Sequence, residues 1–205
     1  MEPFSLALFA ELIGTAVFAA SGASAAVGKR LDMFGVVVIG ATTALGGGAT
    51  RDVLINAPPL VLVDWRYATV AVLAALAVFF FHPALSRLRT AMLVLDAAGL
   101  ALFTVVGTMK GLDYDLAVYA ACIVGVLSGV GGGVLRDVLT QEIPVILRED
   151  FYALAAASGA VIVAVAEPWE SRLGTLTLAA TAAATIFIVR MIAIKYRWKA
   201  PKPKF

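Results

Sequence analysis

The sequence predicts an all-α integral membrane protein in which seven transmembrane helices form two inverted three-helix repeats followed by one further helix. The support is an apolar composition, seven apolar stretches of membrane-spanning length and an internal repeat. Hydrophobic residues make up 61% of the 205 positions and charged residues 15%, and the mean hydropathy is +0.95. A soluble domain of this size could not bury so much apolar surface. We therefore expect one membrane domain over residues 1–205, with membrane lipids as its surroundings.

The predicted spans follow from hydropathy, because a helix needs about 20 mostly apolar residues to cross the hydrocarbon core. The seven stretches cover residues 4–27, 33–56, 66–82, 90–109, 116–140, 151–167 and 173–194. The first stretch is interpreted as a retained helix rather than a cleaved signal. Glu11 interrupts its apolar run, and no Lys or Arg precedes it.

Basic residues between the spans predict the orientation of the chain. Lys29 and Arg30 follow the first span, Arg87 and Arg89 follow the third, and the tail 195–205 is also basic. The positive-inside rule places these groups in the cytoplasm, so the N-terminus is expected outside and the C-terminus inside. A net charge of +2 is too small to indicate a nucleic-acid partner.

An ungapped internal repeat aligns residues 46–54 with residues 131–139, 85 positions later, and both segments read G-G-G-x-x-R-D-V-L. Repeat 1 covers residues 4–82 and repeat 2 covers residues 90–167. Each repeat contains three spans, an odd number, so the second must enter the bilayer from the opposite side. Inverted repeats of this kind place a functional site near the membrane midplane, between the two copies. The seventh helix, 173–194, has no counterpart and is interpreted as an addition.

Three consecutive glycines lie inside the second span and three inside the fifth, and we expect them to break both helices. These residues are Gly46, Gly47, Gly48, Gly131, Gly132 and Gly133. Each glycine costs up to about 1 kcal/mol of helix propensity and exposes backbone groups that lipid cannot satisfy. The ends of the half-helices would then be free to bind ions. The alternative is that the glycines only permit close packing between helices.

Six charged residues lie within the first, second, fourth and fifth predicted spans, and burying each without a partner costs roughly 2.5–3.5 kcal/mol. They are Glu11, Arg51, Asp52, Asp96, Arg136 and Asp137. Adjacent helix positions point about 100° apart, so we expect partners on other helices. The hypothesis pairs Arg51 with Asp96 or Asp137, and it pairs Arg136 with Glu11 or Asp52, across the repeat interface. The alternative is that these groups form buried salt bridges that only fix helix register.

The sequence contains no motif that indicates enzyme chemistry. The glycine segments lack the G-K-[ST] ending of a phosphate loop, and no Ser/His/Asp set or paired general acid and base is present. Cys122 is the single cysteine and His82 the single histidine, which excludes a dense His/Cys metal site. We therefore predict no catalytic residues, no bound metal and no cofactor.

Two G-G-G-x-x-R-D segments in inverted three-span repeats, followed by a seventh span, resemble the prokaryotic branch of the trimeric intracellular cation (TRIC) channel family. The resemblance covers essentially the whole chain. It implies a multi-pass protein of the prokaryotic inner (plasma) membrane that forms a homotrimer with one pore in each subunit. It also implies passive permeation of monovalent cations, mainly K⁺, with K⁺ or Na⁺ as the only ligand.

On this resemblance the two glycine triplets supply helix kinks, and Arg51, Asp52, Arg136 and Asp137 lie at or beside the pore. An arginine near a cation path repels the ion, so it must be neutralised, for example by Glu11 or Asp96, or must act as a gate. The competing function is a secondary transporter of a small amino acid such as glycine, since inverted repeats also suit carriers. A non-conducting scaffold is a third reading, but it leaves six intramembrane charges unexplained.

Overall fold

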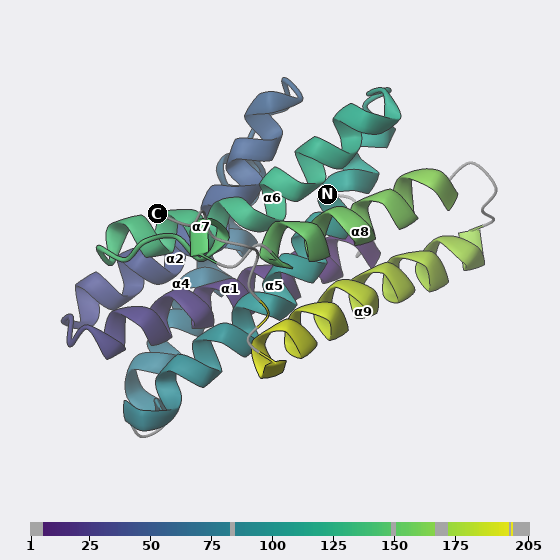
Figure 1. The fold of residues 1–205 in the computed structure, drawn as a ribbon. Helices are drawn as coiled ribbons and strands as arrows, with labels where there is room; N and C mark the ends of the chain where they lie inside the picture. Colours follow the sequence, from purple (N-terminus) through teal and green to yellow (C-terminus); the bar gives the residue numbers. More distant parts are fainter. Residues whose placement is uncertain (1–5, 83–84, 149–150, 167–171, 197, 199–205) are drawn as a thin grey trace.

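The computed structural model describes residues 6–82, 85–148, 151–166, 172–196 and 198, and the regular structure in these ranges is entirely helical. Long helices make up most of the molecule (Figure 1), and the described residues also form two single-turn helices of four residues each. The helices are α1 Leu6–Gly28, α2 Met33–Leu54, α3 Leu60–Val63, α4 Trp65–Phe81, α5 Leu85–Asp113, α6 Val118–Leu139, α7 Val145–Arg148, α8 Phe151–Ala166 and α9 Arg172–Tyr196.

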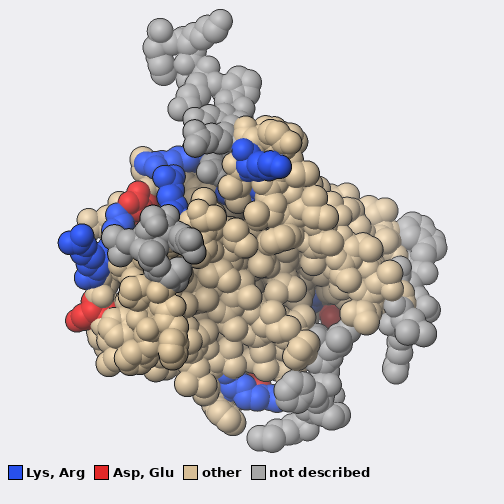
Figure 2. All heavy atoms as spheres, turned by 90° about the horizontal axis from the view of Figure 1, so that it is seen from below, with Lys and Arg blue, Asp and Glu red and all other residues tan. Residues whose placement is uncertain are grey.

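Five of these helices, α1, α2, α5, α6 and α9, are long and apolar enough to cross a membrane. The apolar helices α4 and α8 have 17 and 16 residues, close to the lower limit of about 17 for a spanning helix. In Figure 2 the charged side chains lie mostly at the margins of the visible face, and a broad uncharged area separates them. These features are those of a multi-pass membrane protein.

Helices α1, α2, α5 and α6 form the centre of the molecule. Helix α1 packs against α5 and α2 packs against α6, while α1 also contacts α2 and α5 also contacts α6. Helix α4 packs on α1 and α2, and α8 packs in the same way on α5 and α6. Helix α9 contacts α5 and α8, so it extends one side of the molecule (Figure 1).

The expectation that glycines break the second and fifth helices is wrong. Helix α2 continues through Gly46–Gly48 and α6 continues through Gly131–Gly133, and no described glycine has a positive φ. Both helices end later, just before Asn56 and Gln141, which have φ values of 56° and 57°. The chain then turns toward α3 and α7. The turns are therefore 85 positions apart, as the glycine motifs are.

Close packing between α2 and α6 explains the middle glycine of each triplet. A side-chain carbon on Gly47 would overlap the carbonyl oxygen of Ser128, and one on Gly132 would overlap the carbonyl oxygen of Thr43. Backbone atoms cannot move aside as a flexible side chain can. The alternative interpretation, in which small residues permit two membrane helices to approach closely, is the one that the structure supports.

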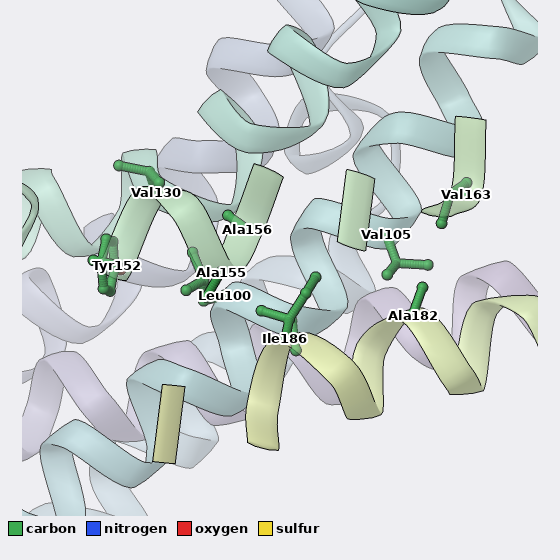
Figure 3. Packing of buried hydrophobic residues seen from close by; sticks show 10 residues of the cluster. Leu100, Val105, Val130, Tyr152, Ala155, Ala156, Val163, Ala182 and Ile186 are labelled. Carbon is green, nitrogen blue, oxygen red and sulfur yellow. The ribbon is translucent and has the colours of Figure 1, made fainter. Parts of the chain in front are cut away.

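The largest apolar cluster joins α9 to repeat 2. Figure 3 shows Ala182 and Ile186 of α9 beside residues of α5 and α8. Among the members, Leu100, Ala156 and Ile186 are fully buried. A membrane offers little hydrophobic drive for helices to associate, so close fit between such side chains is what holds α9 in place.

Candidate functional site

Cluster 1 is a buried group of ionisable side chains from α1, α2, α4 and α5. It contains Glu11, Arg51, Asp52, Tyr67 and Lys110. The guanidinium of Arg51 donates from Nη1 to Glu11 Oε1 at 2.9 Å and from Nε to Asp52 Oδ1 at 2.8 Å. Lys110 Nζ donates to the same Asp52 oxygen at 2.9 Å, and the Tyr67 hydroxyl donates to Glu11. Two carboxylates thus face two cations, which leaves cluster 1 formally neutral.

Cluster 2 is the corresponding group in the second half of the chain. Arg136 donates from Nη1 to Asp96 Oδ1 and from Nε to Asp137 Oδ1, the latter at 2.9 Å. The same Nη1 also donates to the hydroxyl of Ser21 on α1 at 2.8 Å. Arg136 and Asp96 are almost completely buried, with exposed fractions of 0% and 1%. Such a charge is tolerated in the interior because three hydrogen bonds from the guanidinium go to two carboxylates and a hydroxyl.

Each aspartate of the R-D pair also holds the start of a short helix. The second oxygen of Asp52 accepts the backbone N–H of Leu60, the first residue of α3, at 3.0 Å. Asp137 accepts the N–H of Val145, the first residue of α7, at 2.8 Å. Leu60 and Val145 are 85 positions apart, as the aspartates are. The ion pairs and the turns that follow α2 and α6 therefore form one connected unit in each half.

The pairing expected across the repeat interface is wrong. Arg51 pairs with Glu11 rather than Asp96 or Asp137, and Arg136 pairs with Asp96 rather than Glu11 or Asp52. Each arginine also pairs with its own sequence neighbour. Adjacent helix positions diverge, but the long arginine side chain carries three nitrogens at different distances from the backbone. Nε lies near enough to reach the neighbouring aspartate, while Nη1 extends to the next helix.

The structure brings together every ionisable residue that the sequence singled out, three in each cluster. Their role beside an ion path stays a prediction. The charge geometry is suited to such a role, because each arginine is flanked by two carboxylates and its field on a passing cation is reduced. Of the glycines, Gly48 and Gly133 lie next to the clusters, where Gly133 borders the carboxylate of Asp96.

A small pocket opens beside cluster 1. It is lined by Glu11, Thr15, Gly48, Arg51 and Tyr67, among others, and its volume is about 20 Å³. A cavity needs about 10–15 Å³ to hold one water molecule, so the pocket has room for about one. This is too little for a hydrated cation or an amino acid. Cluster 1 is therefore closed to either ligand in this conformation.

Sequence reasoning missed two basic residues. Lys110 lies just beyond the predicted span 90–109, but α5 continues to Asp113 and carries its ammonium group to Asp52. Arg190 lies inside the apolar span 173–194 and is 1% exposed, with its guanidinium carbon 4.8 Å from the centre of the Tyr152 ring. A lone charge in an apolar span is itself the signal for such a residue.

A further ion pair lies outside the spans and connects the two halves. Lys29, just after α1, pairs with Glu142, which follows α6. The hydrogen bond from Lys29 lowers the pKa of the Glu142 carboxyl, and the positive charges of Lys29, Arg148 and Arg89 act in the same direction. Both side chains are largely exposed. Among the residues that the structure describes, no group of three His, Cys, Asp or Glu side chains is placed to hold a metal ion.

Apolar helices surround two buried, paired ion clusters, and this arrangement is that of a multi-pass membrane protein with charged groups in its interior. A family model described as glycine transporter matches the chain twice, over residues 8–83 and 93–168. Two solved structures are similar over nearly the full chain. The TRIC channel orthologue of Rhodobacter sphaeroides has a TM-score of 0.88 and 31% identity, and it covers 95% of this chain and 100% of its own. A second TRIC cation channel structure has a TM-score of 0.83 and 34% identity, over 96% and 97% of the two chains.

Two bacterial membrane proteins are also similar in sequence to this chain. A UPF0126 membrane protein of Deinococcus radiodurans is 46% identical over 153 residues, 73% of this chain and 71% of its own. The UPF0126 inner membrane protein YadS of Escherichia coli is 37% identical over 198 residues, 96% and 95% of the two chains. The chain belongs to the prokaryotic branch of the TRIC channel family.

Proposed function

We propose that this protein is a cation channel with one path in each subunit, running between the two halves of the chain beside clusters 1 and 2. The observation that carries the proposal is the near full-length likeness to TRIC cation channels at about one-third identity. The buried clusters support it, because both place each arginine between two carboxylates. Cations can approach such a site without meeting an uncompensated positive charge.

The finer features of the proposal follow from the sequence. Helices α4 and α8 cross the membrane as the third and sixth of seven spans, and residues 4–82 and 90–167 form inverted repeats. The N-terminus lies outside and the C-terminus in the cytoplasm of a prokaryotic inner membrane. The assembly is a homotrimer, because the neighbour from Rhodobacter sphaeroides is described as a trimeric channel orthologue. The main permeant ion is K⁺, with Na⁺ as the competing one.

A glycine carrier is the alternative suggested by the name of the family model. Such a carrier needs a positive group to bind the carboxylate of its substrate, and Arg51 or Arg136 would be the obvious choice. Each of these guanidinium groups already contacts two protein carboxylates. A substrate carboxylate would have to displace one of them in a buried site, at considerable cost. The clusters therefore favour cations over amino acids.

The proposal is tested by reconstituting the full chain in planar bilayers and in liposomes. We expect unitary K⁺ currents in the bilayers and little uptake of labelled glycine by the liposomes. Saturable glycine uptake without single-channel steps would overturn the proposal. A matched control is Ser158→Ala on α8, because that hydroxyl bonds only to a backbone carbonyl of its own helix, Ala155, at 2.8 Å. This variant should conduct as the unmodified protein does.

A further inference from the structure

One cation of cluster 1 comes from the other half of the chain. The other members of the cluster belong to α1, α2 and α4, whereas Lys110 lies in the last turn of α5. Its ammonium group donates to Asp52 Oδ1 at 2.9 Å, the same oxygen that accepts from Arg51 Nε at 2.8 Å. Lys110 therefore connects repeat 2 directly to the charged centre of repeat 1.

Lys110 is also close to the molecular surface. Its side chain is 18% exposed, whereas the side chains of Arg51 and Asp52 are each 1% exposed. Just beyond α5, Leu116 packs against the small apolar cluster that contains Ile55, the residue that follows α2. Cluster 1 thus lies near the end of the bundle at which α2 and α5 both end. A lysine there has a flexible stem and a strongly hydrated head, so it can exchange its ion pair for water.

Lys110 does not belong to the duplicated part of the clusters. Glu11, Arg51 and Asp52 all have charged copies 85 positions later, but the position 85 residues before Lys110 is occupied by Ala25. Cluster 2 nevertheless has the same two arginine–carboxylate pairs and the same bond from its aspartate to a short helix. These pairs form in cluster 2 without a lysine from this repeat position. Building the ion pairs therefore does not account for Lys110.

The charge of cluster 1 depends on Lys110. With the ammonium group in place, two carboxylates face two cations. Without it, Glu11 and Asp52 face Arg51 alone, and the two carboxylates and one guanidinium sum to a formal charge of −1. Both carboxylates line the pocket that has room for about one water molecule. A buried, uncompensated negative charge attracts a cation, and an unhydrated K⁺ ion is similar in size to an ammonium group.

We propose that Lys110 is a gating residue that sets the charge of cluster 1. Held on Asp52, its ammonium group neutralises the cluster and keeps it closed to free cations. When the side chain moves into water, cluster 1 gains one negative charge, and a monovalent cation takes the place of the ammonium group. The effect on ion movement rests on the proposed channel function. The exchange itself is a property of cluster 1 and is tested without transport.

The first test measures the thermal unfolding midpoint (Tm) of the purified full chain in detergent, in KCl and in N-methyl-D-glucamine chloride of equal concentration. It compares the unmodified protein with Lys110→Met, which removes the charge and keeps an unbranched side chain. A ligand that binds only the folded state stabilises it, so K⁺ should raise the Tm of Lys110→Met by about 3–6 °C. The Tm of the unmodified protein should differ by less than about 1 °C between the two salts. Equal shifts in both proteins would overturn the proposal.

Two further variants assign the K⁺ dependence to cluster 1. Lys29→Met removes another lysine that pairs with a carboxylate, Glu142, but both of these side chains are largely exposed. No buried charge results, so its Tm should not depend on K⁺. Lys110→Met/Asp52→Asn removes one charge of each sign, and its K⁺ dependence should disappear. A K⁺ dependence that persists in this double variant, or that Lys29→Met shares, would contradict the proposal.

Amine labelling tests the exchange in the unmodified protein, where no variant has to fold. The protein is acetylated in the same two salts, and the modified lysines are quantified by mass spectrometry. Because K⁺ competes with the ammonium group for Asp52, acetylation of Lys110 should rise in KCl while that of Lys29 stays the same. Equal acetylation of Lys110 in both salts would overturn the exchange.

Cation flux from proteoliposomes supplies the functional readout, at a temperature where all variants are folded. Flux through Lys110→Met should saturate at a lower K⁺ concentration than flux through the unmodified protein, and Lys110→Met/Asp52→Asn should return toward the original value. An unchanged half-saturating concentration would overturn the gating role. If the unmodified protein passes no cations while the Tm and labelling patterns hold, the channel proposal fails and the exchange at cluster 1 stands.

Discussion

Clusters 1 and 2 use the same positions of the two repeats, yet their surroundings differ. In cluster 1 the Lys110 side chain is 18% exposed, and a pocket with room for about one water molecule opens beside Arg51. The arginines of both clusters are buried, with exposed fractions of 1% and 0%, but only cluster 2 lies next to α9, where Arg190 contacts the ring of Tyr152. The two halves of the chain therefore share their ion pairs and differ in what surrounds them. The difference predicts that cluster 2 responds more strongly than cluster 1 to the same change.

The largest difference is expected when the central arginine is removed. Arg136→Met deprives Asp96 and Asp137 of their shared partner in a buried site, which should cost about 3–5 kcal/mol of unfolding free energy. Arg51→Met should cost less, because Asp52 keeps its bond to Lys110 and Glu11 keeps its bond from Tyr67. Denaturant or thermal unfolding of both variants in detergent measures the difference. A larger loss of unfolding free energy for Arg51→Met would contradict the prediction that cluster 2 responds more strongly than cluster 1.

A smaller difference is expected at the third glycine of each motif. A methyl group on Gly133 would approach the Tyr152 hydroxyl to 2.8 Å and an Asp96 oxygen to 3.0 Å, whereas one on Gly48 would meet its nearest neighbour, a Phe103 ring carbon, at 3.6 Å. Gly133→Ala should therefore cost about 1–3 kcal/mol through overpacking. Gly48→Ala should be neutral or slightly stabilising, because alanine favours the helix. The midpoints of thermal unfolding compare the two, and equal values would contradict the tighter packing of cluster 2.

The smallest effect concerns the ion pair between Lys29 and Glu142. The pKa of Glu142 is lowered in the folded protein, so the stability that this pair contributes is present above the usual carboxyl pKa and is lost as the pH falls through the lowered value. The Tm difference between the unmodified protein and Glu142→Gln should be small at neutral pH and should disappear as the pH falls through the lowered pKa of Glu142. Lys29→Met should give the same pattern, and the double variant should add nothing. A Tm difference that persists in acid would mean that a group other than the Glu142 carboxylate causes it.

The repeat and the identity of the buried charges were predictable from sequence, because both depend on local patterns. Arg51, Asp52 and Glu11 are conspicuous in apolar spans, and their copies recur after 85 positions. The choice of partner was not predictable in this way. It depends on the reach of an arginine side chain and on the packing of α1 against α2, neither of which appears in the spacing of residues.

The glycine triplets show a different limit of sequence reasoning. Helix propensity alone predicts a break at Gly46–Gly48, but a helix inside a membrane keeps its backbone hydrogen bonds because no water competes for them. The gain from close contact with another helix then outweighs the propensity cost. The chain instead turns after Leu54 and Leu139, where Asn56 and Gln141 adopt positive φ. Only one residue, Ile55 or Thr140, separates each motif from its turn.

The contact between α2 and α6 has the form of an isologous interface. Gly47 meets Ser128, and Gly132 meets Thr43, so position i of one repeat touches position j of the other and j touches i in return. This is the rule for two identical subunits related by a two-fold axis. Each half of the chain thus presents the same repeat positions to the other half. A substitution at one of these positions changes one contact directly and leaves the residues of its counterpart unchanged, so the two contacts can vary separately.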